Sequence, residues 1–151
     1  AMNSNGLQTR VYCEEELVVI VPADHPLAKS STTTLAEALT YDFVGLQSGT
    51  PLAARVDYES SRLGRTPNFK IQVRGVETLC RMVAAGLGLG IVPEAAAKRY
   101  LGRMGLCKVA INEAWAKRRL FLGYRDHATL RHAARLLVSY LGRDRGWAMA
   151  D

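Results

Sequence analysis

Cysteines, histidines and long apolar runs are scarce in this sequence, and each shortage excludes a class of protein. The three cysteines, Cys13, Cys80 and Cys107, are odd in number, widely spaced and form no C-x-x-C pair, which predicts reduced thiols rather than disulfides. No apolar run reaches the roughly 18 residues of a membrane-spanning helix. Ala1-Met2-Asn3 looks like a tag remnant, and no signal-peptide pattern follows it. We therefore expect a cytoplasmic protein without a membrane segment.

Side chains that carry catalysis or bind metals are also few and unfavourably spaced. His127 and His132 do not have the i, i+4 spacing that places two metal ligands on one helix face. His25 lies in a His-Pro turn, where a structural role is more common than metal binding. Gln47-Ser48-Gly49 does not match the G-x-S-x-G nucleophile elbow, and no Ser-His-Asp or Cys-His set is visible by motif. The sequence therefore predicts no enzyme, no metal site and no cofactor.

The apolar content of the chain is sufficient for one hydrophobic core. With 151 residues and 48% hydrophobic residues, the chain is expected to form one domain. Lysine and arginine together number 20 against 14 acidic residues, which gives a net charge of +6. The arginines are scattered through expected helices, and a solvated basic face explains them more simply than nucleic-acid binding. Trp115 lies in a polar connection, where it would cover a core edge or fill an interface.

Strand and helix patterns alternate along the chain. Leu17–Val21 is a continuous apolar run closed by Pro22, which predicts a strand buried on both faces. This alternation predicts an α/β fold with a mostly parallel sheet flanked by helices. Further strands are expected at residues 42–46, 69–73, 106–109 and 120–124, and helices at residues 35–39, 52–63, 94–100 and 126–141.

Residues 74–93 predict a helix, a tight turn and a short buried strand. Gly86 is well placed to end the helix, because glycine enters the left-handed conformation without a Cβ penalty. Gly88 and Gly90 follow a helix and precede a strand, which is the reverse of a dinucleotide fingerprint. We therefore interpret them as positions of close helix-to-strand packing. The apolar face of the helix has i, i+3, i+4, i+7 spacing: Val76, Leu79, Cys80 and Val83.

Three motifs, in this order, resemble the effector-binding domain of LysR-type transcriptional regulators. They are the strand and turn of residues 16–28, the strand of residues 43–46 with its Gln-Ser-Gly-Thr loop, and the glycine-rich residues 83–93. The match covers about residues 7 to 142. The resemblance implies one lobe of a type 2 periplasmic-binding-protein-like fold, whose two α/β lobes enclose a small-molecule cleft. The residues from Leu17 to about Arg119 would form the second lobe.

The resemblance also implies how the rest of the chain is organised. We expect a tag remnant and loose N-terminus at residues 1–10, the effector-binding lobe at 11–125, and a C-terminal helix and tail at 126–151. In the family this helix returns to the first lobe, and Leu17–Val21 and Leu120–Tyr124 are adjacent crossover strands. Neither that lobe nor a winged helix-turn-helix is seen in this sequence, so we expect no sequence-specific DNA binding by this chain.

The helix expected at residues 126–141 carries an apolar stripe that would be an association hazard in water. Either the helix folds back over its own lobe, or it packs on another copy of the chain. We expect the second, a homodimer with the stripe inside its interface and Arg131, His132 and Arg135 mostly outside it. The stripe consists of Leu130, Ala133, Ala134, Leu137, Val138 and Leu141.

Two loops are the candidate effector-binding residues. Gln47, Ser48, Gly49 and Thr50 follow a strand and begin a helix, where free N–H groups and the helix dipole favour a small carboxylate-like anion. An ordinary capping turn, with Thr50 as the cap, is the alternative. The matching loop, Gly75, Val76 and Glu77, lines the cleft in the family, although Glu77 also suits a helix start. The alternative function is an oligomerisation or interaction module that binds no ligand.

Overall fold

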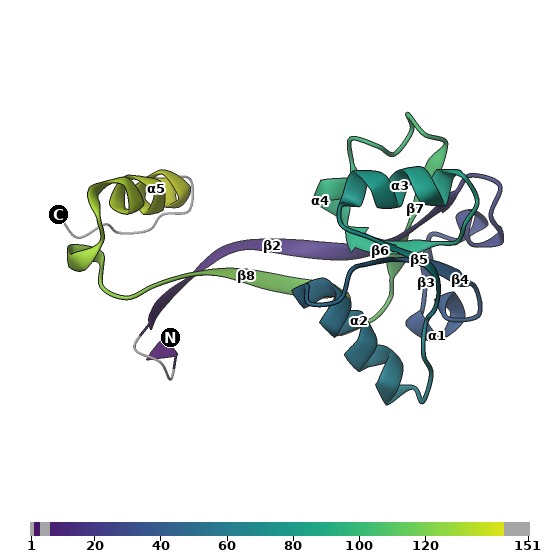
Figure 1. Ribbon diagram of the computed structural model, residues 1–151, viewed down its shortest axis with the longest axis horizontal. Helices are drawn as coiled ribbons and strands as arrows, with labels where there is room; N and C mark the ends of the chain where they lie inside the picture. The colour runs from purple at the N-terminus through teal and green to yellow at the C-terminus, as the bar shows by residue number, and fades with distance from the viewer. Residues whose placement is uncertain (1, 4–6, 144–151) are drawn as a thin grey trace. The chain divides into compact units, whose positions relative to one another are not determined.

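The computed structural model describes residues 2–3 and 7–143, and the chain divides into two units (Figure 1). The first unit consists of the chain up to Glu14 and from Arg118 onward. The second unit is Glu15–Lys117. The second unit lies within the lobe expected at residues 11–125. Of the expected tag remnant Ala1-Met2-Asn3, Ala1 lies outside the described residues, and so does the tail from residue 144 onward.

The centre of the second unit is the apolar half of strand β2 (Leu7–Pro22). Residues Leu17–Val21 are at most 1% exposed, as expected for a strand buried on both faces. Strand β2 pairs antiparallel with β6 (Gly90–Pro93) along one edge and with β7 (Leu106–Ile111) along the other. Only β3 (Thr32–Thr33) joins this part of the sheet in parallel, against β7.

The main sheet is therefore mixed, and the prediction of a mostly parallel sheet is wrong for it. The prediction rested on the alternation of strand and helix patterns along the chain, and the apolar run of Leu17–Val21 suited it. Neither pattern reports the direction in which neighbouring strands pair. The α/β class itself is confirmed.

Two further strands do form a parallel pair. β4 (Asp42–Leu46) and β5 (Asn68–Val73) are joined by helix α2 (Pro51–Arg62) and pair with Leu46 opposite Val73. The chain at Leu89 extends this pair, because its backbone N–H donates to the Asp42 carbonyl at 2.9 Å and its carbonyl accepts from Val44 at 2.8 Å. Both strands lie at the positions that the sequence predicts.

Alternate side chains of β2 enter two hydrophobic clusters. Leu17, Val19 and Val21 pack in one cluster with residues of α1 (Leu35–Ala38) and α2. Val18 and Ile20 pack in the other, with residues of α3 (Val76–Ala84) and α4 (Glu94–Ala97). The helices thus cover both faces of the strand (Figure 1). Short 3-10 turns at Pro26–Lys29 (η1) and Ala114–Ala116 (η2) complete the unit.

The helix–turn–strand prediction for residues 74–93 is confirmed. Helix α3 ends at Ala84, and Gly86 has φ +80° in the following turn. A Cβ atom on Gly90 would lie 2.5 Å from Leu79 Cδ2, so this glycine allows the close helix-to-strand packing that was predicted. A Cβ on Gly88 would instead lie 2.5 Å from the Asp42 carbonyl oxygen, so this glycine allows close approach to β4.

His25 has a structural contact in the turn before η1. Its Nδ1 accepts a hydrogen bond from the Leu27 backbone N–H at 3.2 Å, which requires that Nδ1 carry no proton. The ring also lies edge-on to Tyr41 at 4.6 Å between centroids. Burial lowers the pKa of His25, and the neighbouring Asp24 carboxylate partly opposes this.

The first unit is built on the N-terminal half of β2. β1 (Met2–Asn3) pairs antiparallel with it, and β8 (Lys117–Tyr124) also pairs with β2. Arg10 Nε donates to Tyr124 Oη at 3.0 Å, which fixes where β8 lies. The strands that contain Leu17–Val21 and Leu120–Tyr124 therefore do pair, as expected. The pairing lies along the N-terminal half of β2, because β6 and β7 occupy the two edges of β2 at Val18–Ile20. Residues 2–3 and 7–10, expected to be loose, belong to β1 and β2, so that expectation is wrong for them.

The C-terminal helix is shorter than predicted. Asp126 begins a separate 3-10 turn, η3 (His127–Thr129), by accepting a hydrogen bond from Ala128 N at 3.2 Å, and α5 runs over His132–Gly142. Of the expected stripe, Val138 is buried, while Leu137 is 57% exposed. Leu136 and Tyr140 are also exposed, at 57% and 68%. We call Leu136, Leu137 and Tyr140 the exposed face of α5.

Candidate ligand-binding site

The seven predicted site residues lie where two neighbouring strands of the second unit lead into helices. Because β4 and β5 are parallel, their carboxyl ends meet at one edge, where residues 47–50 lead into α2 and residues 74–75 lead into α3. The Gln47 backbone N–H donates to the Val73 carbonyl at 2.9 Å, so the two loops start side by side. The N-termini of α2 and α3 therefore reach the same edge of the strand pair.

The first loop combines a capped helix start with an exposed, glycine-containing turn. Thr50 Oγ1 accepts from the Ala53 backbone N–H at 3.1 Å, as predicted for the cap of α2, and Pro51 is the first helical residue. Gln47, Ser48 and Gly49 are exposed. Gly49 has φ +93°, and a Cβ there would meet nothing within 4 Å. The loop is thus open to solvent at the positive end of the α2 dipole.

In the second loop, Gly75 and Val76 lie at the start of α3, and Gly75 supplies no side-chain cap. The Glu77 carboxylate turns back along its own helix: Arg81 Nη2 donates to Glu77 Oε1 at 2.9 Å, and Tyr100 Oη to Oε2 at 3.4 Å. The hydrogen bond from Arg81 holds the pKa of Glu77 below its usual value. These contacts favour the helix-start interpretation of Glu77 over a role as a ligand contact.

Arg74 belongs to this site and was missed in the sequence. Its Nε donates to Gln47 Oε1 at 3.1 Å, so an exposed guanidinium connects the two loops. The available signal was its position, directly after the strand expected at residues 69–73. That position indicates a site residue only once β4 and β5 are known to be parallel neighbours.

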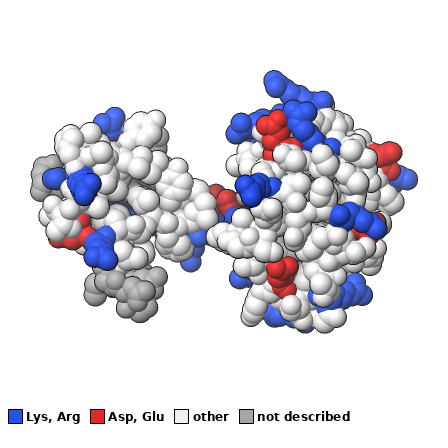
Figure 2. Space-filling model, viewed as in Figure 1, with Lys and Arg blue, Asp and Glu red and all other residues white. Residues whose placement is uncertain are grey.

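On the face drawn in Figure 2, the charged side chains do not gather at one place. Figure 2 shows lysine and arginine in small separate groups on the visible face, with acidic residues among them. Among residues 2–3 and 7–143, no three His, Cys, Asp or Glu side chains are grouped to hold a metal ion. No helix in the same residues is long and apolar enough to cross a membrane.

Two helix N-termini that meet beyond the carboxyl ends of neighbouring parallel strands define a class of small-molecule binding fold. The family model for the LysR substrate binding domain matches residues 2–145. The chain belongs to this family, which confirms the resemblance seen in the sequence. It is an effector-binding domain of the LysR type rather than an enzyme.

Curated relatives share parts of this domain. The chain is 37% identical over 90 residues to the uncharacterized HTH-type transcriptional regulator YybE of Bacillus subtilis, covering 60% of this chain and 31% of the relative. It is 31% identical over 116 residues to YnfL of Escherichia coli, an uncharacterized regulator of the same type, covering 73% and 39%. The matched parts thus span well under half of these relatives.

Solved structures show the same fold. The effector-binding domain of QuiR in complex with shikimate has a TM-score of 0.78 at 20% identity, covering 95% of this chain and 68% of that one. The Synechocystis CcmR regulatory domain in complex with 2-PG has a TM-score of 0.81 at 20% identity. The match covers 99% of this chain and 73% of that one. At this identity the likeness establishes the fold, the periplasmic-binding-protein type 2 fold of LysR regulatory domains.

Proposed function

We propose that this chain is the sensing lobe of a cytoplasmic transcriptional regulator and that it binds a small anionic metabolite bearing a carboxylate. The observation that carries the proposal is the meeting of the α2 and α3 N-termini at two loops joined by Arg74 and Gln47. Backbone N–H groups at a helix start and a neighbouring guanidinium both favour an anion. Shikimate and 2-phosphoglycolate, named with two structural neighbours, are both carboxylates.

The residues have different roles in this proposal. The backbone N–H groups of Ser48, Gly49 and Thr50 hold the carboxylate, and Arg74 adds a charge-assisted hydrogen bond. Gly75 and Val76 line the other side of the site. Glu77 stays with Arg81 and contributes little to binding.

The test is a thermal-shift screen of organic acids, followed by titration of variants with the acid that gives the largest shift. A ligand that binds only the folded state raises its stability by mass action, by about 2.7 kcal/mol at a concentration 100 times Kd. Gly49→Val should weaken binding at least about tenfold, because valine is strained at φ +93° and shifts the donating N–H groups. Glu77→Gln should change Kd by less than about threefold, within the range of a surface ion pair.

Gly64→Val is the matched control for the backbone change. Gly64 also has a positive φ, of +65°, and open space around its Cβ direction, but it follows α2 instead of preceding it. Its valine variant should bind like the parent chain. Equal affinity of the Gly49 and Gly64 variants would remove the support for this site.

The alternative function is an interaction module that binds no effector, and the exposed face of α5 is the observation that favours it. We propose that this face pairs two copies of the chain, whether or not an effector binds. Sedimentation at micromolar concentration should show a dimer, and Leu137→Glu should give monomers because it places a charge in the interface. Arg135→Glu, on the same helix, should leave the dimer intact. A parent chain that sediments as a monomer would contradict the pairing.

A further inference from the structure

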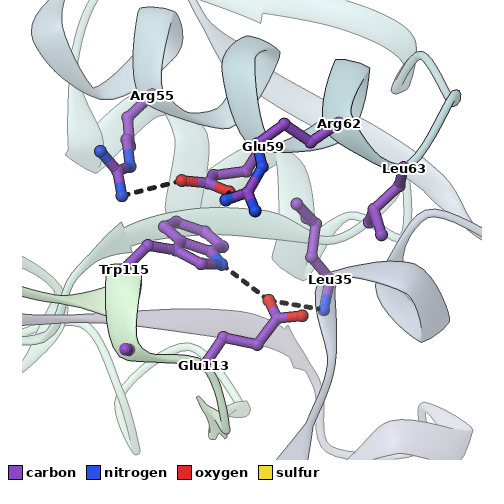
Figure 3. A pocket seen from close by; sticks show the side chains of 8 residues that line it. Leu35, Arg55, Glu59, Arg62, Leu63, Glu113 and Trp115 are labelled. Atoms are coloured by element: carbon purple, nitrogen blue, oxygen red, sulfur yellow. Dashed lines mark hydrogen bonds and ion pairs between the residues drawn. The ribbon is translucent and has the colours of Figure 1, made fainter.

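A second pocket lies beside α2, separate from the two loops of the proposed effector site. Its volume is about 440 Å³, and none of its lining residues belongs to residues 47–50 or 74–77. The pocket is lined by Arg55, Glu59, Arg62, Glu113, Trp115 and the leucines Leu35 and Leu63 (Figure 3).

The α2 wall of this pocket carries a positive charge. Glu59 is only 5% exposed and lies between two guanidinium groups. Arg55 Nη2 lies 2.8 Å from Glu59 Oε1 as an ion pair without hydrogen-bond geometry, and Arg62 Nη1 donates to Oε2 at 3.1 Å. One carboxylate between two guanidinium groups leaves one net positive charge. Each guanidinium has five N–H donors in a planar fork, so both keep donors for a second carboxylate.

Glu113 on the facing wall carries the opposite charge in a fixed position. Its Oε2 accepts from the Trp115 indole N–H at 2.7 Å and from the Leu35 backbone N–H at 3.2 Å. These two bonds orient both the carboxylate and the indole ring. Figure 3 shows the ring of Trp115 between the α2 side chains and Glu113. Across the pocket, a cationic wall is therefore followed by an aromatic surface and then by an anionic wall.

We infer that this pocket binds a small zwitterion with an apolar or aromatic side chain, as in an α-amino acid. A simple anion would meet the carboxylate of Glu113, and a simple cation would meet the guanidinium groups of Arg55 and Arg62. A zwitterion satisfies both walls, with its carboxylate at the arginines and its ammonium at Glu113. Its side chain packs on Trp115 and on the leucines of the rim. This site is distinct from the anion site of the proposed function and does not depend on it.

The test uses Trp115 as the reporter. The sequence has two tryptophans, Trp115 and Trp147, so Trp147→Phe leaves the pocket tryptophan as the single source of indole fluorescence. Three compounds with the same ring are titrated: L-phenylalanine, 3-phenylpropanoate, which lacks the ammonium, and phenethylamine, which lacks the carboxylate. L-phenylalanine should give a saturable change, and each single-charge analogue should bind at least about tenfold more weakly, since each loses a charge-assisted interaction.

Glu113→Gln separates charge from structure. Glutamine keeps an oxygen that accepts from Leu35 and Trp115, but it removes the negative charge. In this background L-phenylalanine should bind about tenfold more weakly and lose its advantage over 3-phenylpropanoate. Asp57→Asn removes an exposed acid from the same helix without touching the pocket and should leave the titration unchanged.

Three results would overturn the inference. The first is equal affinity for the three compounds, and the second is the absence of any saturable change up to millimolar concentrations. The third is loss of the L-phenylalanine signal in Gly49→Val, which would assign the compound to the effector loops. A second site is supported if Gly49→Val keeps the L-phenylalanine signal and Glu113→Gln no longer binds L-phenylalanine more tightly than 3-phenylpropanoate.

Discussion

Replacing Gly88 with alanine is expected to lower the free energy of unfolding by about 3–5 kcal/mol, the sum of a strained backbone and a steric overlap. Gly88 has φ +150°, which alanine rarely adopts. The new Cβ would also lie 2.5 Å from the Asp42 carbonyl oxygen and 3.0 Å from the Phe43 nitrogen. These are backbone atoms, and the hydrogen bonds between Leu89 and β4 prevent them from moving away.

Gly64→Ala is the matched control. Gly64 also has a positive φ, of +65°, but its Cβ direction is open, so only the conformational cost of about 1–2 kcal/mol remains. Urea denaturation of both variants measures the difference. If the two variants lose the same free energy, then contact with β4 adds nothing, and the packing described for Gly88 is wrong.

The second large effect is expected at the contact between α3 and β6. Leu79 is fully buried, so Leu79→Ala should cost about 2–5 kcal/mol through lost burial and a cavity. Gly90→Ala should cost about 1–3 kcal/mol, because its Cβ would lie 2.5 Å from Leu79 Cδ2 and 3.4 Å from Val83 Cγ2. Gly90 does not have a positive φ, so this cost is steric alone.

The double variant tests whether the two costs share one cause. Removing the Leu79 side chain takes away the atoms that the new Cβ would overlap, and that Cβ then occupies part of the cavity. The double variant should therefore be more stable than the sum of the single effects by about 1 kcal/mol or more, as expected for residues in direct contact. Urea denaturation of the parent chain, the two single variants and the double variant gives this coupling energy. Strict additivity would show that Gly90 and Leu79 do not meet.

The features predicted best from the sequence are those that depend on neighbours along the chain. The helix, turn and strand of residues 74–93 follow from apolar spacing and from glycines placed where the backbone needs them. Thr50 was predicted as a cap for the same reason. The direction of strand pairing depends on contacts between distant segments, such as Val19 with both Ile91 and Val109, and no local pattern reports it.

The same distinction applies to the candidate site. The loops at residues 47–50 and 75–77 were proposed from the rule that ligands bind beyond the carboxyl ends of strands. The guanidinium of Arg74 and the contact of Glu77 with Tyr100 depend on distant parts of the chain and were missed. The sequence did not decide whether Trp115 covers an edge of the core or fills an interface. The indole packs against the core cluster and bonds to Glu113.

The pairing of β2 also determines when this chain can fold during synthesis. The partners of Val19, Ile91 and Val109, leave the ribosome only about 70–90 residues after it. At roughly 5–20 residues per second, that interval lasts about 4–18 s. Through this time Leu17–Val21, an apolar run of high β propensity, has neither of its edge partners, and such a segment is an aggregation hazard. The nascent chain therefore depends on protection of β2 until β7 has emerged.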